Sequence, residues 1–272
     1  GSFPPVDGCS VSSDENRPAD VVAAGRPVAV VTGASRGIGA ATAVLLATRG
    51  WDIAVGYRAD NHAAAAVVGA CQAGGARAVA VAADVSSEQE VVAMFAAVDR
   101  SLGPVAALVN SAGIVDQRAR VDEMTAARVT QMFAVNVVGS FLCAREALRR
   151  MSTRHGGAGG AIVNVSSAAS RLGSPGEYVD YAASKGAIDT MTVGLAREVA
   201  GEGVRVNAVR PGLIATGIHA SGGQPDRLAR LVPLIPMGRG GEVREVAAAI
   251  AWLCSDEASY VTGSLLDVSG GR

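Results

Sequence analysis

The chain has 272 residues, of which 49% are hydrophobic, enough to bury the core of one large α/β domain. Its 24 basic and 25 acidic residues give a formal net charge of −1 without a long run of either sign, so we expect neither a nucleic acid nor a membrane as partner. No uninterrupted apolar stretch approaches the roughly 20 residues that cross a bilayer. Four scattered cysteines and three dispersed histidines predict no metal site, no disulfide framework and a cytoplasmic location.

The first 25 residues are rich in Ser, Pro, Asp and Gly. They lack the basic start and the apolar core of a secretory signal. We expect residues 1–25 to form a flexible tail and residues 26–272 to form a single domain.

From Pro27 onward, short β-branched or apolar runs alternate with alanine-rich helical patterns. This alternation predicts right-handed βαβ units, and strands without polar alternation are typical of sheets covered on both faces. We therefore expect an α/β fold, a doubly wound parallel sheet in a three-layer α/β/α sandwich. The predicted strands span about 28–32, 53–57, 78–81, 105–109, 161–165 and 204–209, and the helices about 37–49, 61–73, 87–102, 126–151, 178–201 and 242–254.

Two segments between these elements carry signals of their own. Ser87 precedes Glu90 by three residues, which predicts a capping box at the start of a helix. Residues 212–241 contain Gly and Pro with little periodicity, and a long segment of this kind in a compact domain is more often functional than idle. We expect residues 212–241 to form a lid over a substrate.

A glycine-rich turn, TGASRGIG over residues 32–39, directly follows the first predicted strand. Such a turn before a helix lets backbone N–H groups approach a pyrophosphate without obstruction by a Cβ atom. The spacing of Gly33, Gly37 and Gly39 departs from the general GxGxxG pattern by placing three residues between the first pair. Three glycines alone could form only a tight turn, but the strand and helix around them favour a dinucleotide site.

The residues after the second strand predict which dinucleotide binds. Sites for NAD usually place an acidic residue about 20 positions beyond the turn, but this chain has Tyr57-Arg58 there. Arg36 lies inside the turn, so two guanidinium groups could converge on a 2′-phosphate. The pattern favours NADP(H), with NAD(H) as the alternative, because both arginines could be solvated surface residues and Asp60 is nearby.

Tyr181 and Lys185 stand four residues apart in the segment YAASK. On a helix such residues face the same way, roughly 6 Å apart. A phenol titrates near pH 10, and a cation held beside it favours the phenolate. The pair therefore predicts a tyrosine that works as a general acid and base.

Further motifs follow the later strands: Asp84-Val85, Asn110-Ser111-Ala112-Gly113, Asn136, Ser167 and Pro211-Gly212. Together with the glycine turn and the Tyr181/Lys185 pair, they resemble the short-chain dehydrogenase/reductase family, particularly single-domain members similar to β-ketoacyl carrier-protein reductases and glucose 1-dehydrogenases. The resemblance runs from Val28 to the C-terminus. It implies a Rossmann-type sheet of about seven strands and hydride transfer between a nicotinamide and a carbonyl or secondary alcohol, without metal.

By this resemblance, Tyr181 donates a proton to the carbonyl oxygen during reduction, while Lys185 holds the nicotinamide ribose and lowers the tyrosine pKa. Ser167 orients the same oxygen, and Asn136 supports a water-mediated proton path to Lys185. The expected cofactor contacts are Gly33, Ser35, Arg36, Gly37, Ile38, Gly39, Tyr57, Arg58, Asp84, Val85, Asn110, Ala112, Gly113, Tyr181, Lys185, Pro211, Gly212, Ile214 and Thr216.

The chain departs from the family pattern in two places. Ser111 stands where the family usually has a second Asn, a mild change because serine keeps a hydrogen-bonding side chain. The interval between the serine and the tyrosine is one residue longer than common, which leaves Ser166 as a competitor of Ser167. Tyr178 is excluded as the catalytic tyrosine because the residue four positions on is Ala182 rather than lysine.

A nucleotide-binding sensor that keeps the fold without turnover is an alternative, although the intact Asn136, Ser167, Tyr181 and Lys185 argue against it. Nucleotide-sugar epimerisation usually needs a larger C-terminal substrate domain, and the roughly thirty irregular residues after Gly212 leave no room for one. The resemblance also implies a homotetramer that pairs the helices over 126–151 and 178–201, with a last strand near 261–267 at a subunit contact. Which carbonyl or alcohol is the substrate does not follow from the fold.

Overall fold

The structure is a computed structural model that describes residues 25–216, 222–224 and 226–272. The tail expected over 1–25 thus falls almost wholly outside the described residues, as does part of the segment 212–241. Seven parallel strands form one sheet in the order β3-β2-β1-β4-β5-β6-β7. The strands are β1 (Val28–Val31), β2 (Asp52–Tyr57), β3 (Ala78–Ala82), β4 (Val105–Asn110), β5 (Gly160–Val165), β6 (Val204–Pro211) and β7 (Leu265–Val268).

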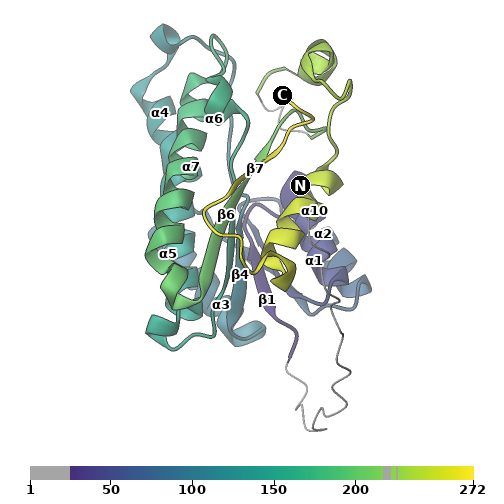
Figure 1. Ribbon diagram of the computed structural model, residues 1–272, viewed down its shortest axis with the longest axis vertical. Helices are drawn as coiled ribbons and strands as arrows, with labels where there is room; N and C mark the ends of the chain where they lie inside the picture. The colour runs from purple at the N-terminus through teal and green to yellow at the C-terminus, as the bar shows by residue number, and fades with distance from the viewer. Residues whose placement is uncertain (1–24, 217–221, 225) are drawn as a thin grey trace, which may run out of the picture.

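Helices cover both faces of this sheet (Figure 1). One face carries α1 (Gly37–Thr48), α2 (Asn61–Ala73) and α10 (Val243–Cys254), and the other carries α3 (Glu88–Ser101), α4 (Ala126–Phe133), α5 (Gly139–Met151) and α7 (Val179–Val199). Short helices α6 (Ala169–Leu172) and α9 (Arg227–Leu231) lie in the connections.

Each face of the sheet packs its own hydrophobic core. Val30 and Val31 are neighbours in β1, both fully buried, yet Val30 joins the core with Phe95 and Val31 joins the core with Leu46. Successive residues of a strand point to opposite faces, so a strand covered on both sides is apolar throughout. The three-layer, doubly wound fold expected from the sequence is confirmed.

The helix predicted over 126–151 is not one α-helix. A π-helical turn, η2 (Ala134–Val138), separates α4 from α5. The other predicted helices and strands agree with the structure to within a few residues. The interruption matters because π-turns occur often at functional sites.

The capping box expected at the start of α3 forms only by half. The Ser87 hydroxyl accepts a hydrogen bond from Glu90 N at 3.4 Å. The Glu90 carboxylate accepts from Asp84 N at 2.9 Å, and Ser87 N donates to Asp84 O instead. The acidic residue therefore ties the end of β3 to α3.

The continuous helical run Ala126–Met151 is long and apolar enough to span a bilayer by length and composition, which the sequence analysis did not anticipate. In this fold the run packs against β4, α3 and α7, and core helices commonly pass the same test. Its exposed side includes Val138 and Phe141.

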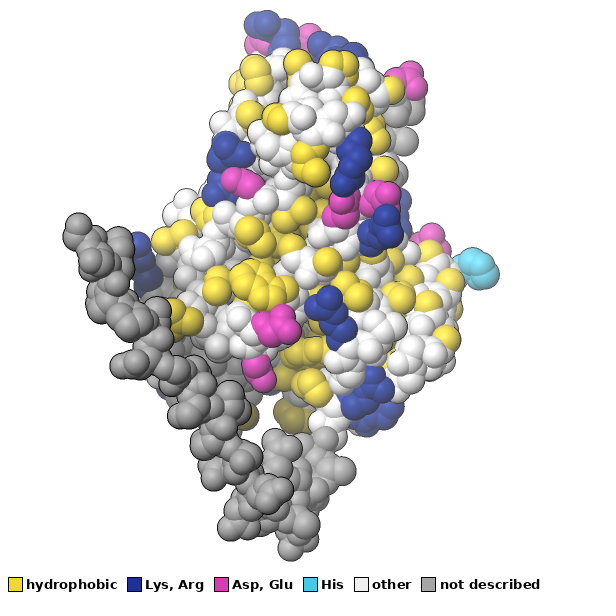
Figure 2. Space-filling view, turned by 45° about the vertical axis from the view of Figure 1, so that its right-hand side comes forward, with side chains coloured by type: hydrophobic (Ala, Val, Ile, Leu, Met, Phe, Trp, Pro, Cys, Tyr) yellow, Lys and Arg dark blue, Asp and Glu magenta, His cyan; other side chains and the backbone are white. Residues whose placement is uncertain are grey.

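Charged side chains on the face drawn in Figure 2 are mixed in sign, with apolar side chains between them. Many charged side chains of the described residues form short-range pairs, such as Arg239 with Glu245 at 2.6 Å. Exposed pairs of this kind contribute little to stability, because water and salt screen them.

Candidate active site

The order of the strands reverses between β1 and β4, where the chain turns from one half of the sheet to the other. Open α/β sheets bind ligands at this point, beyond the carboxyl ends of the strands. Nearly all of the predicted site residues follow such an end. The glycine turn follows β1, Tyr57-Arg58 follow or end β2, Asp84-Val85 follow β3, Asn110–Gly113 follow or end β4, Ser166-Ser167 follow β5, and Pro211–Thr216 follow or end β6.

The three glycines of the turn serve different purposes. Gly33 has φ +62°, and a Cβ atom there would lie 2.7 Å from Ala112 Cα. A Cβ at Gly39 would lie 2.5 Å from Gly33 O, whereas a Cβ at Gly37 would meet nothing within 4 Å. Gly33 and Gly39 therefore pack the turn, and Gly37 leaves open space at the start of α1.

This open space belongs to a groove of about 690 Å³ lined by Gly37, Ala40, Ala215 and Thr216, among others. From the N-terminus of α1 the groove runs along the helix to Thr48, and its walls are mostly apolar, with Val44, Leu45 and Val243 among them, so only its Gly37 end concerns phosphate. A helix N-terminus with exposed backbone N–H groups stabilises phosphate. The residues present thus fit a dinucleotide pyrophosphate.

Thr32 connects the two loops on either side of the switch point, a role that the sequence analysis missed. Its Oγ1 atom accepts hydrogen bonds from Ser111 N and Ala112 N, both at 3.1 Å. The same hydroxyl lies 3.4 Å from Val109 O, to which it donates. A buried threonine at the end of an apolar strand was the available signal.

The charged residues expected to select the cofactor follow β1 and β2. Arg36 and Arg58 are exposed. The Asp60 carboxylate accepts from Ala63 N at 2.9 Å and caps α2. A hydrogen bond from the Ser86 hydroxyl lowers the pKa of Asp84. Burial opposes this shift, and the charge of Arg58 adds to it.

Tyr181 and Lys185 lie on the first turns of α7, and the Lys185 Nζ atom is 5.6 Å from the centre of the Tyr181 ring. Lys185 is the only lysine in the chain. Its ammonium group donates to Val165 O at 2.7 Å. Burial lowers the pKa of Lys185 to about 8, while the charge of Asp189 opposes the shift.

The pKa of Tyr181 moves opposite to the direction predicted from the sequence. Burial raises it, because the phenolate is poorly solvated there, and this outweighs the lowering by the Ser167 hydroxyl and by the charge of Arg227. The expectation that Lys185 sets a low tyrosine pKa is wrong for the chain alone. The phenol is held in its protonated form at neutral pH.

The two candidate serines have different surroundings. Ser166 is 2% exposed, and its hydroxyl donates to Lys185 O at 3.2 Å. Ser167 is half-buried, accepts from Ala169 N at 3.1 Å and acts on the Tyr181 phenol as a hydrogen-bonding neighbour. The geometry thus brings Ser167, rather than Ser166, beside the phenol.

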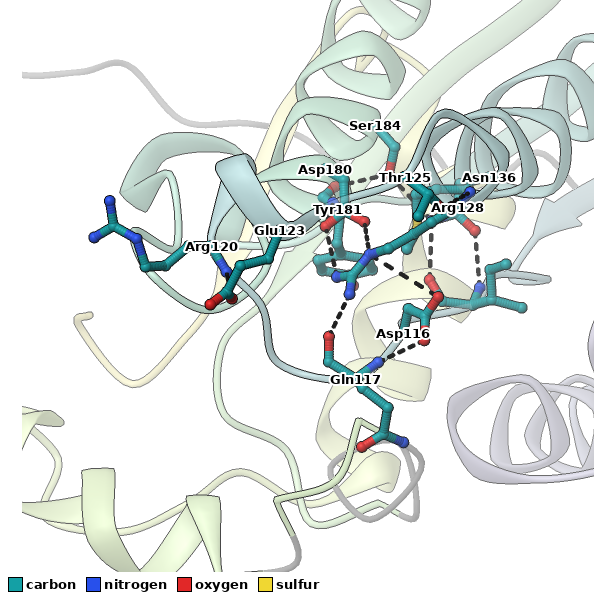
Figure 3. A network of polar contacts seen from close by, with 12 residues as sticks. Asp116, Gln117, Arg120, Glu123, Thr125, Arg128, Asn136, Asp180, Tyr181 and Ser184 are labelled. Carbon is teal, nitrogen blue, oxygen red and sulfur yellow. Dashed lines mark hydrogen bonds and ion pairs between the residues drawn. The ribbon is translucent and has the colours of Figure 1, made fainter.

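Asn136 lies in the middle of the π-turn, and both ends of its amide group are hydrogen-bonded (Figure 3). Its Oδ1 accepts from Ile114 N at 2.8 Å, and its Nδ2 donates to Ile114 O at 3.0 Å and to Ser184 Oγ at 3.1 Å. Ser184 Oγ donates in turn to Tyr181 O at 2.7 Å. Asn136 therefore joins the loop after β4 to the helix that carries Tyr181.

Gly113 marks the point where these groups meet. A Cβ atom at Gly113 would lie 3.4 Å from Asn136 Oδ1 and 3.6 Å from Lys185 Nζ. Because Gly113 has no side chain, the loop after β4 approaches both the lysine and the asparagine closely.

A buried polar chain beneath the site was also missed. The Asn110 amide donates to Asn164 Oδ1 at 3.0 Å and to Ser140 O, and Asn164 donates to Thr192 Oγ1 at 2.9 Å. This chain ties β4 and β5 to α7, with the Asn110 side chain directed into the protein. A polar residue within the apolar run 161–165 was the signal for it.

The segment 212–241 is anchored at its base and near its middle. Ile214 pairs with Gly241 in a parallel bridge. Tyr178, excluded above as a catalytic residue, is buried and donates from its hydroxyl to Gly222 O at 2.8 Å. Glu177 binds Arg227 of α9 at 2.8 Å. Residues just before Tyr181 therefore hold this segment in place.

The sheet, the glycine turn and the Tyr181 site together define a dinucleotide-dependent oxidoreductase. A family model described as enoyl-(acyl carrier protein) reductase matches residues 33–272. An uncharacterised oxidoreductase of Escherichia coli, YgfF, is 58% identical over 245 residues, 90% of this chain and 99% of that protein. A chloroplastic NADPH-dependent aldehyde reductase-like protein of Arabidopsis thaliana is 38% identical, covering 91% of this chain and 94% of that protein.

Among solved structures, a short-chain type dehydrogenase/reductase from Mycobacterium marinum superposes with a TM-score of 0.84 at 32% identity, over 90% of this chain and 94% of that one. The chain belongs to the short-chain dehydrogenase/reductase family. It is an oxidoreductase that acts on CH–OH and C=O groups, in a family that uses a nicotinamide cofactor.

Proposed function

We propose that the chain is an NADP(H)-dependent enzyme that transfers a hydride between the nicotinamide and a carbonyl or secondary alcohol, with a site made of Tyr181, Lys185, Ser167 and Asn136. One observation carries the proposal. The Tyr181 phenol has Ser167 as its hydrogen-bonding neighbour, and Lys185 Nζ lies beside Gly113 in the loop after β4, at the switch point of the sheet.

The roles of the side chains follow from their surroundings. Tyr181, kept protonated by burial, gives its proton to the carbonyl oxygen as negative charge develops there. The Ser167 hydroxyl donates to the same oxygen and fixes its direction. When bound, the reduced nicotinamide supplies the hydride. The Lys185 ammonium and the Asn136 amide line the path by which a proton returns to the phenol.

NADP(H) is proposed over NAD(H) because of charge. Arg36 and Arg58 offer cationic donors at the ribose end, and the Asp60 carboxylate, two residues after Arg58, is used to cap α2. The name of the Arabidopsis relative specifies NADPH. The described part of 212–241 would then act as the substrate lid.

A homotetramer is proposed as the working form. The helical run Ala126–Met151 leaves Val138 and Phe141 47% and 52% exposed, and a second copy could cover them. Sedimentation should give a tetramer, with Phe141→Glu shifting it toward smaller species. A monomeric wild-type protein would contradict this assembly.

The function can be tested with a carbonyl panel that includes β-ketoacyl thioesters, sugars, steroids, quinones and aldehydes, following the absorbance of reduced nicotinamide. We expect turnover with NADPH that falls about 100-fold or more in Tyr181→Phe. Tyr260→Phe is the matched control because Tyr260 is fully exposed. NADPH binding without Tyr181-dependent turnover would instead favour a nucleotide sensor.

A further inference from the structure

Arg128 and Asp180 form a buried ion pair next to the catalytic tyrosine (Figure 3). Arg128 Nε donates to Asp180 Oδ2 at 2.8 Å and Nη2 donates to Oδ1 at 3.3 Å. The side chains are 12% and 1% exposed. A two-armed contact of this kind fixes orientation as well as distance.

The Asp180 carboxylate also binds the backbone of the next residue, Tyr181. Its Oδ1 accepts from the backbone N of Tyr181 at 2.9 Å, at the very start of α7. The first turn of a helix has N–H groups without helical partners and frays readily. An arginine that holds the Asp180 carboxylate therefore also holds the backbone on which the phenol is mounted.

The third guanidinium nitrogen of Arg128 binds the loop after β4. This atom, Nη1, donates to Gln117 O at 2.7 Å, in the loop that follows β4. Two more contacts tie this loop to the segment before α7, since Arg118 Nε donates to Gly176 O at 3.3 Å and Ala119 N donates to Glu177 O at 3.1 Å.

Gln117 also borders the segment expected to cover the substrate. A Cβ atom built on Gly223 would collide with the Gln117 side-chain oxygen. The guanidinium group of Arg128, on α4, therefore connects the start of α7 to the loop after β4. The same loop faces residues 222–224.

We infer that Arg128 is a positioning residue for hydride transfer: through Asp180 it fixes Tyr181, and through the Gln117 carbonyl it fixes the loop opposite, so that carbonyl and phenol meet in one geometry. This inference rests on the proposed function. It predicts that the loss of Arg128 damages the chemical step while the glycine turn, the expected pyrophosphate site, stays intact.

The chain offers a matched control in the same region. Arg120 pairs with Asp122 at 3.0 Å, but the two side chains are 70% and 68% exposed and touch neither Tyr181 nor the Gln117 carbonyl in the described contacts. Arg120→Met removes the same charge as Arg128→Met from the surface.

Hydrogen exchange, NADPH affinity and steady-state kinetics should be measured on wild type, Arg128→Met, Arg128→Lys and Arg120→Met. The kinetic probe is the carbonyl of the panel that wild type reduces fastest, with NADPH and with NADPH deuterated at the transferred position. In Arg128→Met we expect faster exchange at the start of α7 and in the loop around Gln117, and a kcat lower by about 10- to 100-fold with a larger isotope effect. NADPH affinity should stay within about twofold of wild type.

Arg128→Lys keeps a paired charge but lacks the planar fork. It should restore slow exchange at the start of α7 and part of kcat, without restoring the loop around Gln117. If Arg128→Met does not fold, the exchange rates and kcat of Arg128→Lys test the positioning role instead.

Wild-type exchange and kcat in Arg128→Met, or a loss of kcat matched by an equal loss of NADPH affinity, would overturn the positioning role. The same would follow if Arg120→Met behaved like Arg128→Met. Absence of turnover by the wild type on every carbonyl would contradict the proposed function instead, and the exchange data would still decide whether Arg128 orders α7.

Discussion

The ammonium group of Lys185 lies 5.6 Å from the centre of the Tyr181 ring and gives its hydrogen bond to Val165 O at 2.7 Å. The backbone of β5 therefore fixes the amine beside the phenol. An ammonium has three N–H donors, so this bond leaves two for a ligand.

Burial of Lys185 predicts a measurable dependence of stability on pH. The pKa is about 8 in the folded chain, below the ordinary 10.5, so folding opposes protonation of the amine. The cost is present in full below pH 8 and disappears as the pH rises above 10.5, because the unfolded chain binds more protons between these values. It amounts to about 3 kcal/mol by the cited shift.

Lys185→Met should therefore abolish turnover without lowering the free energy of unfolding near neutrality. The stability of wild type relative to this variant should rise from pH 8 upward, measured by urea denaturation. Since Lys185 is the only lysine, reductive methylation with a 13C label gives one side-chain resonance, whose titration reports the pKa directly. A pKa near 10.5 would contradict the expected burial effect.

The two adjacent serines predict unequal effects. Ser167→Ala should lower kcat about 100-fold, because it removes a donor from the developing oxyanion. Ser166→Ala should lower it far less, since the Ser166 hydroxyl donates only to a backbone carbonyl. Equal losses in the two variants, compared at saturating NADPH, would remove Ser167 from the site.

Cofactor preference should respond to Arg58. Arg58→Asp should weaken NADPH relative to NADH by about 10- to 100-fold, the value of one charged hydrogen bond. Arg49→Asp makes the same charge change at another exposed position and should leave the ratio of the two KM values unchanged. An unchanged ratio in Arg58→Asp would favour NAD(H).

Substitutions at two glycines of the turn should affect stability and cofactor binding differently. Gly33→Ala should destabilise the protein by several kcal/mol, because its Cβ would enter the space of the Ala112 backbone. Gly37→Ala should cost about 1 kcal/mol, from its φ of +59° alone, yet weaken NADPH binding. Thermal denaturation and NADPH titration of both variants check this contrast. Equal destabilisation would contradict it.

The sheet, its helices and the clustering of motifs could be predicted from the sequence, because buried parallel strands, a glycine turn and an i, i+4 pair are all local patterns. The π-turn at Ala134–Val138 could not, since one extra residue in a helix leaves no compositional trace. The pKa of Tyr181 was predicted in the wrong direction because a neighbouring charge is visible in sequence spacing, whereas burial is a property of the whole fold.

The same distinction explains the missed polar contacts. Thr32, Asn164 and Arg128 each bind groups from 20 or more positions away in the sequence. Their partners become neighbours only when the strands have assembled. The choice between Ser166 and Ser167 had the same origin, because one extra residue in the loop before α7 could not be placed without coordinates.

The extra residue of the π-turn sets the rotational phase of α4 against α5. Each residue of an α-helix advances the chain by about 100° around the axis. If the same residues ran on as a regular α-helix without this wider turn, the α4 side chains would be rotated by about that angle and Arg128 would be carried away from Asp180. The π-turn therefore lets the helical run from α4 to α5 direct both Arg128 and Asn136 toward α7, which a regular helix over the same residues would not do.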